Sequence, residues 1–152
     1  MLLAGCGLKP LYATQDGSSA SVELSGISIP EPKSRLEQLV RNELLGQMAG
    51  PGSDGVGVYR LELQQKVATS AVVAAKTGLN QRESLEMSLT YRLFEVSSGK
   101  LLQEGRSFAV IPYDRVSSEF SNLQAVDNAE RRASVQLADD IRTRLAAFFA
   151  TR

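Results

Sequence analysis

The chain has 152 residues, a length that suits one domain able to bury about 70% of its unfolded surface without disulfides or metals. Its 17 basic and 17 acidic residues balance, which argues against a nucleic-acid-binding protein, because such domains are usually strongly basic. The absence of histidine and the single cysteine exclude serine and cysteine triads, histidine acid–base chemistry, the usual zinc sites and an intramolecular disulfide. No apolar run reaches the roughly 18 residues of a membrane-spanning helix.

The N-terminus carries a run of small residues that ends in the only cysteine, Leu3-Ala4-Gly5-Cys6. This pattern is typical of a lipobox, in which signal peptidase II cuts before the cysteine and lipid is attached to its thiol and new amine. Only five residues precede Cys6, fewer than the basic segment and apolar run of a signal peptide, so we interpret residues 1–20 as signal remnant, lipobox and flexible tether. The alternative is an incidental cysteine in a flexible terminus. A single domain is predicted over residues 21–152.

The domain begins with a predicted strand and a predicted helix. Residues 22–29 alternate apolar and polar side chains with a change of phase at Gly26, which predicts a bulged strand that Pro30 and Pro32 end. From Lys33 the apolar period becomes helical, until Gly50 and the residues after it stop the helix. The apolar stripe of this helix is Leu36, Leu39, Val40, Leu44 and Met48.

Three strands follow. The first two alternate strictly, so each has one covered face and one face that is solvated or meets a partner. The covered faces carry Tyr59, Leu61, Leu63, Gln65 and Val67 in one strand and Leu85, Met87, Leu89, Tyr91 and Leu93 in the other. Residues 69–81 between them predict strand extensions that meet at a projecting hairpin tip. A tight turn over residues 97–100 leads into a strand over residues 101–113, which Pro112 ends.

The last predicted element is the longest helix, from residues 118–122 to Phe149, with Leu137 and Ile141 on its apolar side and Arg142 on its solvated side. The order β-α-β-β-β-α predicts an α+β two-layer sandwich, with both helices on one face of a four-stranded, mostly antiparallel sheet.

Several segments together resemble the LptE family of lipopolysaccharide-assembly lipoproteins, in its alphaproteobacterial form. They are the lipobox running into residues 7–12, the long hairpin followed by residues 89–94, the Ser-Gly-Lys turn at 98–100 and residues 137–145. The resemblance covers essentially the whole chain. It implies a non-enzymatic outer-membrane lipoprotein that plugs the LptD β-barrel from the periplasmic side and helps lipopolysaccharide reach the outer leaflet. The covalent lipid on Cys6 would be its only attached group.

The resemblance also suggests where lipopolysaccharide is bound. The family carries a basic residue at the hairpin tip that is implicated in this binding, and Lys76 aligns with it through the following Thr77 and Gly78. Phosphates call for Lys or Arg and acyl chains for apolar neighbours; Arg82 and residues 71–75 offer both beside Lys76. A second basic residue, expected near the start of the last helix, is absent where Val126 stands.

Other interpretations remain open. The polar faces of the strands suit the polar lumen of a large barrel, but they also suit plain solvation. A free-standing periplasmic lipoprotein that binds a small lipid between helices and sheet is the alternative function. An enzyme is disfavoured, because its only candidate carboxylates, Asp139 and Asp140, are adjacent on a helix and point about 100° apart.

Overall fold

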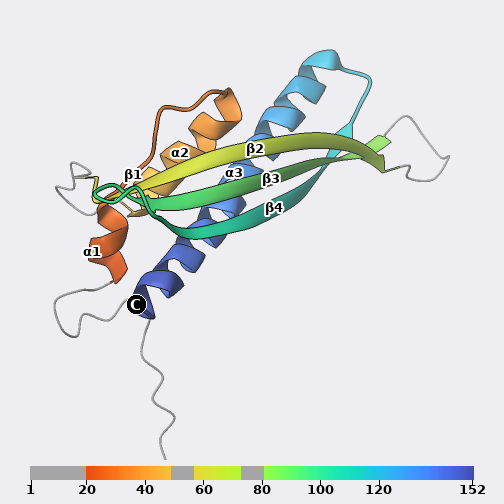
Figure 1. The fold of residues 1–152 in the computed structure, drawn as a ribbon. Helices are drawn as coiled ribbons and strands as arrows, with labels where there is room; N and C mark the ends of the chain where they lie inside the picture. Colours follow the sequence, from red (N-terminus) through yellow and green to blue (C-terminus); the bar gives the residue numbers. More distant parts are fainter. Residues whose placement is uncertain (1–19, 49–56, 73–80) are drawn as a thin grey trace, which may run out of the picture.

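The computed structural model describes residues 20–48, 57–72 and 81–152. Their elements are, in order, α1 (Ala20–Ser25), β1 (Ile27–Ser28), α2 (Arg35–Met48), β2 (Tyr59–Val72), β3 (Gln81–Glu95), β4 (Leu101–Arg115) and α3 (Glu119–Ala150). The strands form one sheet in the order β1-β2-β3-β4, with β1 parallel to β2 and the other pairs antiparallel. Figure 1 shows α2 and α3 on the same side of this sheet, which α3 crosses diagonally. The predicted α+β class, with a mostly antiparallel four-stranded sheet and a long last helix, is confirmed.

The core lies between the sheet and the helices, because alternate side chains of each long strand point inward. The inward side chains of β3 are all buried, and they are the five predicted from the alternation. Tyr91 is among them, and its ring lies over Gly105, its partner in β4. The helices add buried side chains of their own: Val40, Leu44 and Met48 from α2, and Ala129, Ala133, Leu137, Ile141 and Leu145 from α3. None of the described helices is both long and apolar enough to cross a membrane.

The N-terminal segment differs from the bulged strand predicted over residues 22–29. Its first part is the helix α1, and only the two residues of β1 pair with the sheet. Ala20 and Leu24 are both buried and lie one helical turn apart, so the same short apolar pattern satisfies a helix as well as a strand. Gly26 lies between α1 and β1 and is not a bulge.

Strand β4 continues to Arg115, past the end predicted at Pro112. β4 is an edge strand, and a proline is tolerated there when its missing N–H would have faced away from the sheet. The carbonyl oxygen of Pro112 does face outward, because it accepts a hydrogen bond of 3.2 Å from Arg132 Nη2 of α3. The proline therefore marks the outer edge of the sheet.

The turn between β3 and β4 is tight, as predicted. Gly99 has a φ of 66°, a left-handed conformation that favours glycine, and its N–H donates to the Glu95 carbonyl oxygen at 2.9 Å. Beyond the turn the register of the hairpin shifts once, between Leu93 and Phe94.

Helix α3 begins within the predicted range, after Ser118, whose hydroxyl accepts a hydrogen bond from the Ser121 N–H. Leu137 and Ile141 are fully buried, as predicted. Arg142 was expected on the solvated side and is half-buried, because α3 packs against α1 and α2 as well as against β4, so its buried arc is wider than one stripe.

Candidate functional site

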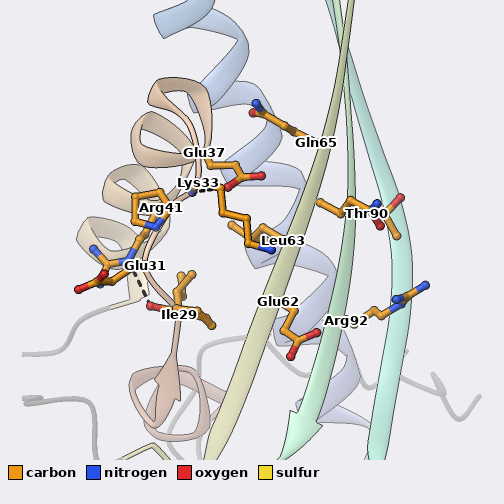
Figure 2. Close-up of a pocket in the computed structure, with 13 residues that line it drawn as sticks. Ile29, Glu31, Lys33, Glu37, Arg41, Glu62, Leu63, Gln65, Thr90 and Arg92 are labelled. Atoms are coloured by element: carbon orange, nitrogen blue, oxygen red, sulfur yellow. Dashed lines mark hydrogen bonds between the residues drawn. The ribbon is translucent and has the colours of Figure 1, made fainter.

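A groove of about 580 Å³ runs beside the edge of β2. One wall is the middle of β2 together with Thr90 and Arg92 of the neighbouring β3, and the other is formed by residues 29–33 and the first half of α2. Figure 2 shows Leu63 and Gln65 pointing from β2 toward α2 across this space. The groove thus lies where the sheet meets the helical layer, and the described structure leaves it open.

Two prolines explain why the edge of β2 is free at this point. β1 pairs only with Tyr59 and Arg60, and the chain then continues into Pro30 and Pro32. Proline has no N–H, so it cannot extend the β1 ladder along β2. From Leu61 onward, no described strand lies beside this edge of β2.

The backbone of β2 presents donors and acceptors to the groove. The Tyr59 N–H donates to the Gly26 carbonyl oxygen at 3.2 Å, and the Tyr59 carbonyl oxygen accepts from Ser28 Oγ at 2.9 Å. Both backbone groups of Tyr59 therefore point away from β3. Because the direction alternates along an antiparallel strand, the N–H and C=O of Leu61, Leu63 and every second residue after them point the same way. Within the described part of the chain these groups have no strand partner.

The helical wall is held by polar contacts. Arg41 Nε donates to the Ile29 carbonyl oxygen at 3.1 Å. The Lys33 N–H donates to the Glu37 carboxylate at 2.7 Å, which fixes the entry into α2. These bonds hold residues 29–33 against α2 and away from β2, so the groove is part of the folded structure.

A hydrogen bond crosses the groove near its upper end. Gln65 Nε2 donates to Ser34 Oγ at 2.6 Å, while Gln65 Oε1 is buried and has no hydrogen-bond partner in the described structure. An unpaired buried acceptor has a desolvation cost, so a donor from a bound molecule would be favourable here.

The face of the sheet opposite the helices is polar and exposed. Arg92 and Glu104 form a cross-strand ion pair of 3.4 Å, and Arg106 Nη2 donates to Ser88 Oγ at 3.2 Å. Phe108 and Val110 interrupt these polar residues and are exposed over 72% and 50% of their surfaces. This is the face predicted to be solvated or to meet a partner.

Of the three predicted site residues, Cys6 and Lys76 lie outside the described residues. Arg82 lies at the start of β3, opposite Val72 of β2, and its Nε donates to Asp114 Oδ1 at 3.2 Å. Both side chains of this pair are more than half exposed, so the guanidinium remains accessible to an anion.

A second hollow, of about 740 Å³, lies between the start of α2, the first turns of α3 and the ends of β3 and β4. On one side Arg35 bridges Asp127 and Glu130 of α3. No local sequence pattern predicts this bridge, because its members are far apart in the chain and each is an ordinary surface charge by local pattern.

On the other side of this hollow, Glu83 accepts hydrogen bonds from Tyr113 Oη at 2.5 Å and from Arg115 Nη1 at 3.0 Å. These bonds lower the pKa of Glu83, the one from Tyr113 most strongly. Burial, and then the negative charge of Glu83 at the other end of the bond, raise the pKa of Tyr113 to about 12. The cluster thus holds its charges in ion pairs. Among the described residues, no group of His, Cys, Asp or Glu side chains suits a metal ion.

Comparison with solved structures finds several bacterial lipoproteins with this fold, among them the following three. A protein of Caulobacter crescentus CB15 described as a lipoprotein has a TM-score of 0.73 at 22% identity, covering 88% of this chain and 97% of its own. The rare lipoprotein B of Shewanella oneidensis has a TM-score of 0.54 at 17% identity, covering 82% and 95%. A minor lipoprotein of Acinetobacter baumannii also has 0.54, at 16% identity, covering 80% and 88%. No curated protein sequence matches the chain.

These likenesses define a class of small two-layer α+β domains found in bacterial lipoproteins. The model of the LptE family, lipopolysaccharide-assembly, matches residues 21–145. The chain therefore belongs to the LptE family, and the predicted resemblance is confirmed. The family is non-catalytic and membership implies a role in lipopolysaccharide assembly. Membership of this family is also consistent with a membrane-anchored protein of the cell envelope.

Proposed function

We propose that this chain is an outer-membrane lipoprotein that plugs an LptD-like β-barrel and assists the assembly of lipopolysaccharide into the outer leaflet. In this proposal the lipid on Cys6 anchors it on the periplasmic side. The observation that carries the proposal is the family match over residues 21–145. Barrel and lipoprotein should purify together in equal amounts from detergent-extracted outer membranes. A lipoprotein recovered alone would contradict the proposal.

The exposed face of the sheet supports a position inside a barrel. Large outer-membrane barrels have a polar interior, and this face offers mostly polar and charged groups on a stiff three-stranded surface. Its ion pairs, such as Arg92 with Glu104, leave little net charge to desolvate when the face meets another polar wall.

The alternative, a free-standing lipoprotein that binds a small lipid, is not favoured by the groove beside β2. Six charged side chains are among those that line it: Glu31, Lys33, Glu37, Arg41, Glu62 and Arg92. Such a lining is unfavourable for acyl chains, because the charges would lose water without gaining a polar partner.

The lipid anchor gives a first prediction. The full-length precursor should fractionate with the outer membrane and carry lipid on Cys6, since Gly7 in the next position is not an aspartate inner-membrane retention signal. Cys6→Ala should abolish membrane association and leave the thermal unfolding midpoint unchanged, because the family domain begins after it. Mass spectrometry of the N-terminal peptide checks the lipid. A wild-type protein that stays soluble with a free thiol would refute the anchor.

The basic residues near the hairpin tip give a second prediction. Lys76→Glu combined with Arg82→Glu should weaken lipopolysaccharide binding at least about tenfold, because each charge-assisted contact to a phosphate contributes about 1.5 to 3 kcal/mol. Binding should also weaken with salt, because exposed charges are screened over about 8 Å at physiological ionic strength. Titration of labelled lipopolysaccharide against the folded variant measures both effects.

A matched control makes the same change in charge elsewhere. Lys100→Glu with Arg152→Glu lies at the opposite end of the sheet, where both residues are exposed. Equal losses in the two double variants would indicate a general charge effect. Unchanged affinity in the tip variant would place the contact elsewhere, with Arg106 and Arg115 as the next candidates.

A further inference from the structure

We infer that the groove beside β2 receives an extended segment of the barrel partner, which joins the sheet as an added strand. This inference rests on the proposed function and specifies which surface of the chain the partner uses. The occupant is a peptide segment, identified by three features of the groove: free backbone groups, a helical wall opposite the strand and a defined pattern of charge.

The free backbone groups come first. From Leu61 to Val67, every second residue of β2 directs its N–H and C=O toward this free edge, as the bonds of Tyr59 indicate, and Leu63 and Gln65 among them line the groove. A strand that lies alongside satisfies both groups at each of these positions, which is the basis of recognition by strand addition. The free stretch spans about 20 Å, at about 3.3 Å for each residue.

The shape of the groove selects a single chain over a folded domain. Residues 29–33 and α2 form a wall opposite β2, and the volume between them is about 580 Å³. A second copy of this domain approaching edge to edge would bring its own helical wall against this one. A single extended segment can instead lie along the strand, where it replaces the Gln65–Ser34 hydrogen bond that crosses the groove.

The side chains beside the edge define the charge of the segment. Glu62 and Lys66 both point to the exposed face of β2, and both are exposed; Glu62 also forms an ion pair of 3.2 Å with Arg60, which a basic residue of the segment would share. Opposite charges on neighbouring strands stabilise their pairing, and like charges destabilise it. The segment therefore carries a basic residue beside Glu62 and an acidic residue beside Lys66. On the other face, Leu63 and Ile29 favour an apolar side chain.

The outer edge of β4 is a poorer acceptor for a strand. Pro112 removes one donor from that edge, and its carbonyl oxygen is already bonded to Arg132. The edge of β2 has neither obstacle between Leu61 and Val67. Natural proteins protect sheet edges that pair with no other strand. Because the edge of β4 is protected by Pro112 and the edge of β2 is not, β2 is the edge that favours an added strand.

The decisive experiment removes one edge donor. Gln65→Pro deletes an N–H that points into the groove, whereas Gln65→Ala keeps this N–H and loses the same side-chain bond to Ser34. Both variants keep the ladder with β3, because the bonds to β3 come from Gln64 and Lys66. Gln65→Pro should bind the purified LptD-type barrel about tenfold more weakly than Gln65→Ala does. Equal affinities in two folded variants would overturn the inference.

A second measurement does not depend on how well the proline variant folds. In the wild-type domain the amides of Leu63 and Gln65 should exchange with solvent quickly, and those of Gln64 and Lys66 slowly. In the complex with the barrel, the first two should become protected as well. Contact through side chains alone would leave them unprotected and would overturn the inference.

Charge exchange tests the specified segment. Glu62→Lys with Lys66→Glu keeps the net charge and should weaken barrel binding, because each new charge faces a like charge. Unchanged binding would refute the charge pattern. Self-association of the wild type that Gln65→Pro abolishes would assign the edge to a second copy and overturn the inference. If the wild type does not join the barrel at all, the proposed function fails together with the inference.

Discussion

Truncation of Leu137 to alanine is expected to lower the free energy of unfolding by about 2 to 5 kcal/mol. Leu137 is fully buried in the core that α3 forms with the sheet, so the lost methyl groups leave a cavity that their neighbours fill only in part. Ile141, one helical turn away, is equally buried and should behave in the same way. Guanidinium unfolding followed by circular dichroism measures the loss.

The matched control is Leu123→Ala, because it makes the same truncation in the same helix. Leu123 is exposed over 62% of its surface. Its truncation to alanine should lower the free energy of unfolding by less than about 0.5 kcal/mol. Arg142 is unsuitable as a control, since it is half-buried. Similar small losses at Leu137 and Leu123 would show that α3 is not packed on the sheet.

Replacement of Gly105 with alanine is expected to cost about 2 to 3 kcal/mol, a typical overpacking penalty. A Cβ atom at this position would lie 2.4 Å from Tyr91 Oη and 2.5 Å from its Cζ, well inside van der Waals contact. Tyr91 is fully enclosed, so its ring has little room to move away. The same denaturant titration detects the loss.

Removal of the ring should suppress this penalty. Tyr91→Ala alone costs about 3 to 5 kcal/mol through the cavity it leaves, but adding Gly105→Ala to it should cost little more, because nothing then opposes the new methyl group. Simple addition of the two losses would show that the cost at Gly105 does not come from contact with Tyr91.

Strict alternation made the long strands predictable. In β3 the inward series from Leu85 to Leu93 is uninterrupted over nine residues, and such a period is incompatible with a helix. The last helix was equally clear, because its apolar residues keep helical spacing over some eight turns. Long periodic segments thus fixed the class of the fold.

Short segments were ambiguous for a physical reason. The stretch from Ala20 to Ser25 is too short for its apolar spacing to separate one helical turn from a strand, so packing decides the outcome. Pro112 predicts the end of a strand, because the sequence does not show that β4 lies at an edge of the sheet. Both predictions are wrong because the packing of α1 and the edge position of β4 depend on tertiary structure, which local sequence does not show.

The groove beside β2 illustrates the same limit at the candidate site. Pro30 and Pro32 correctly predicted where the first strand stops. The sequence could not show that this strand lies parallel to β2 and so leaves the rest of that edge open, because residues more than 30 positions apart decide the pairing. The ion pairs of Arg35 with α3 depend on equally distant residues.

Helix α3 closes the core of the domain. Helix α3 packs against α1 and α2 as well as against β3 and β4. Without residues 119–150, the inward side chains of the sheet lack their main cover, and α1 and α2 lack the helix on which they pack. A chain truncated before α3 therefore leaves an apolar sheet surface prone to aggregation.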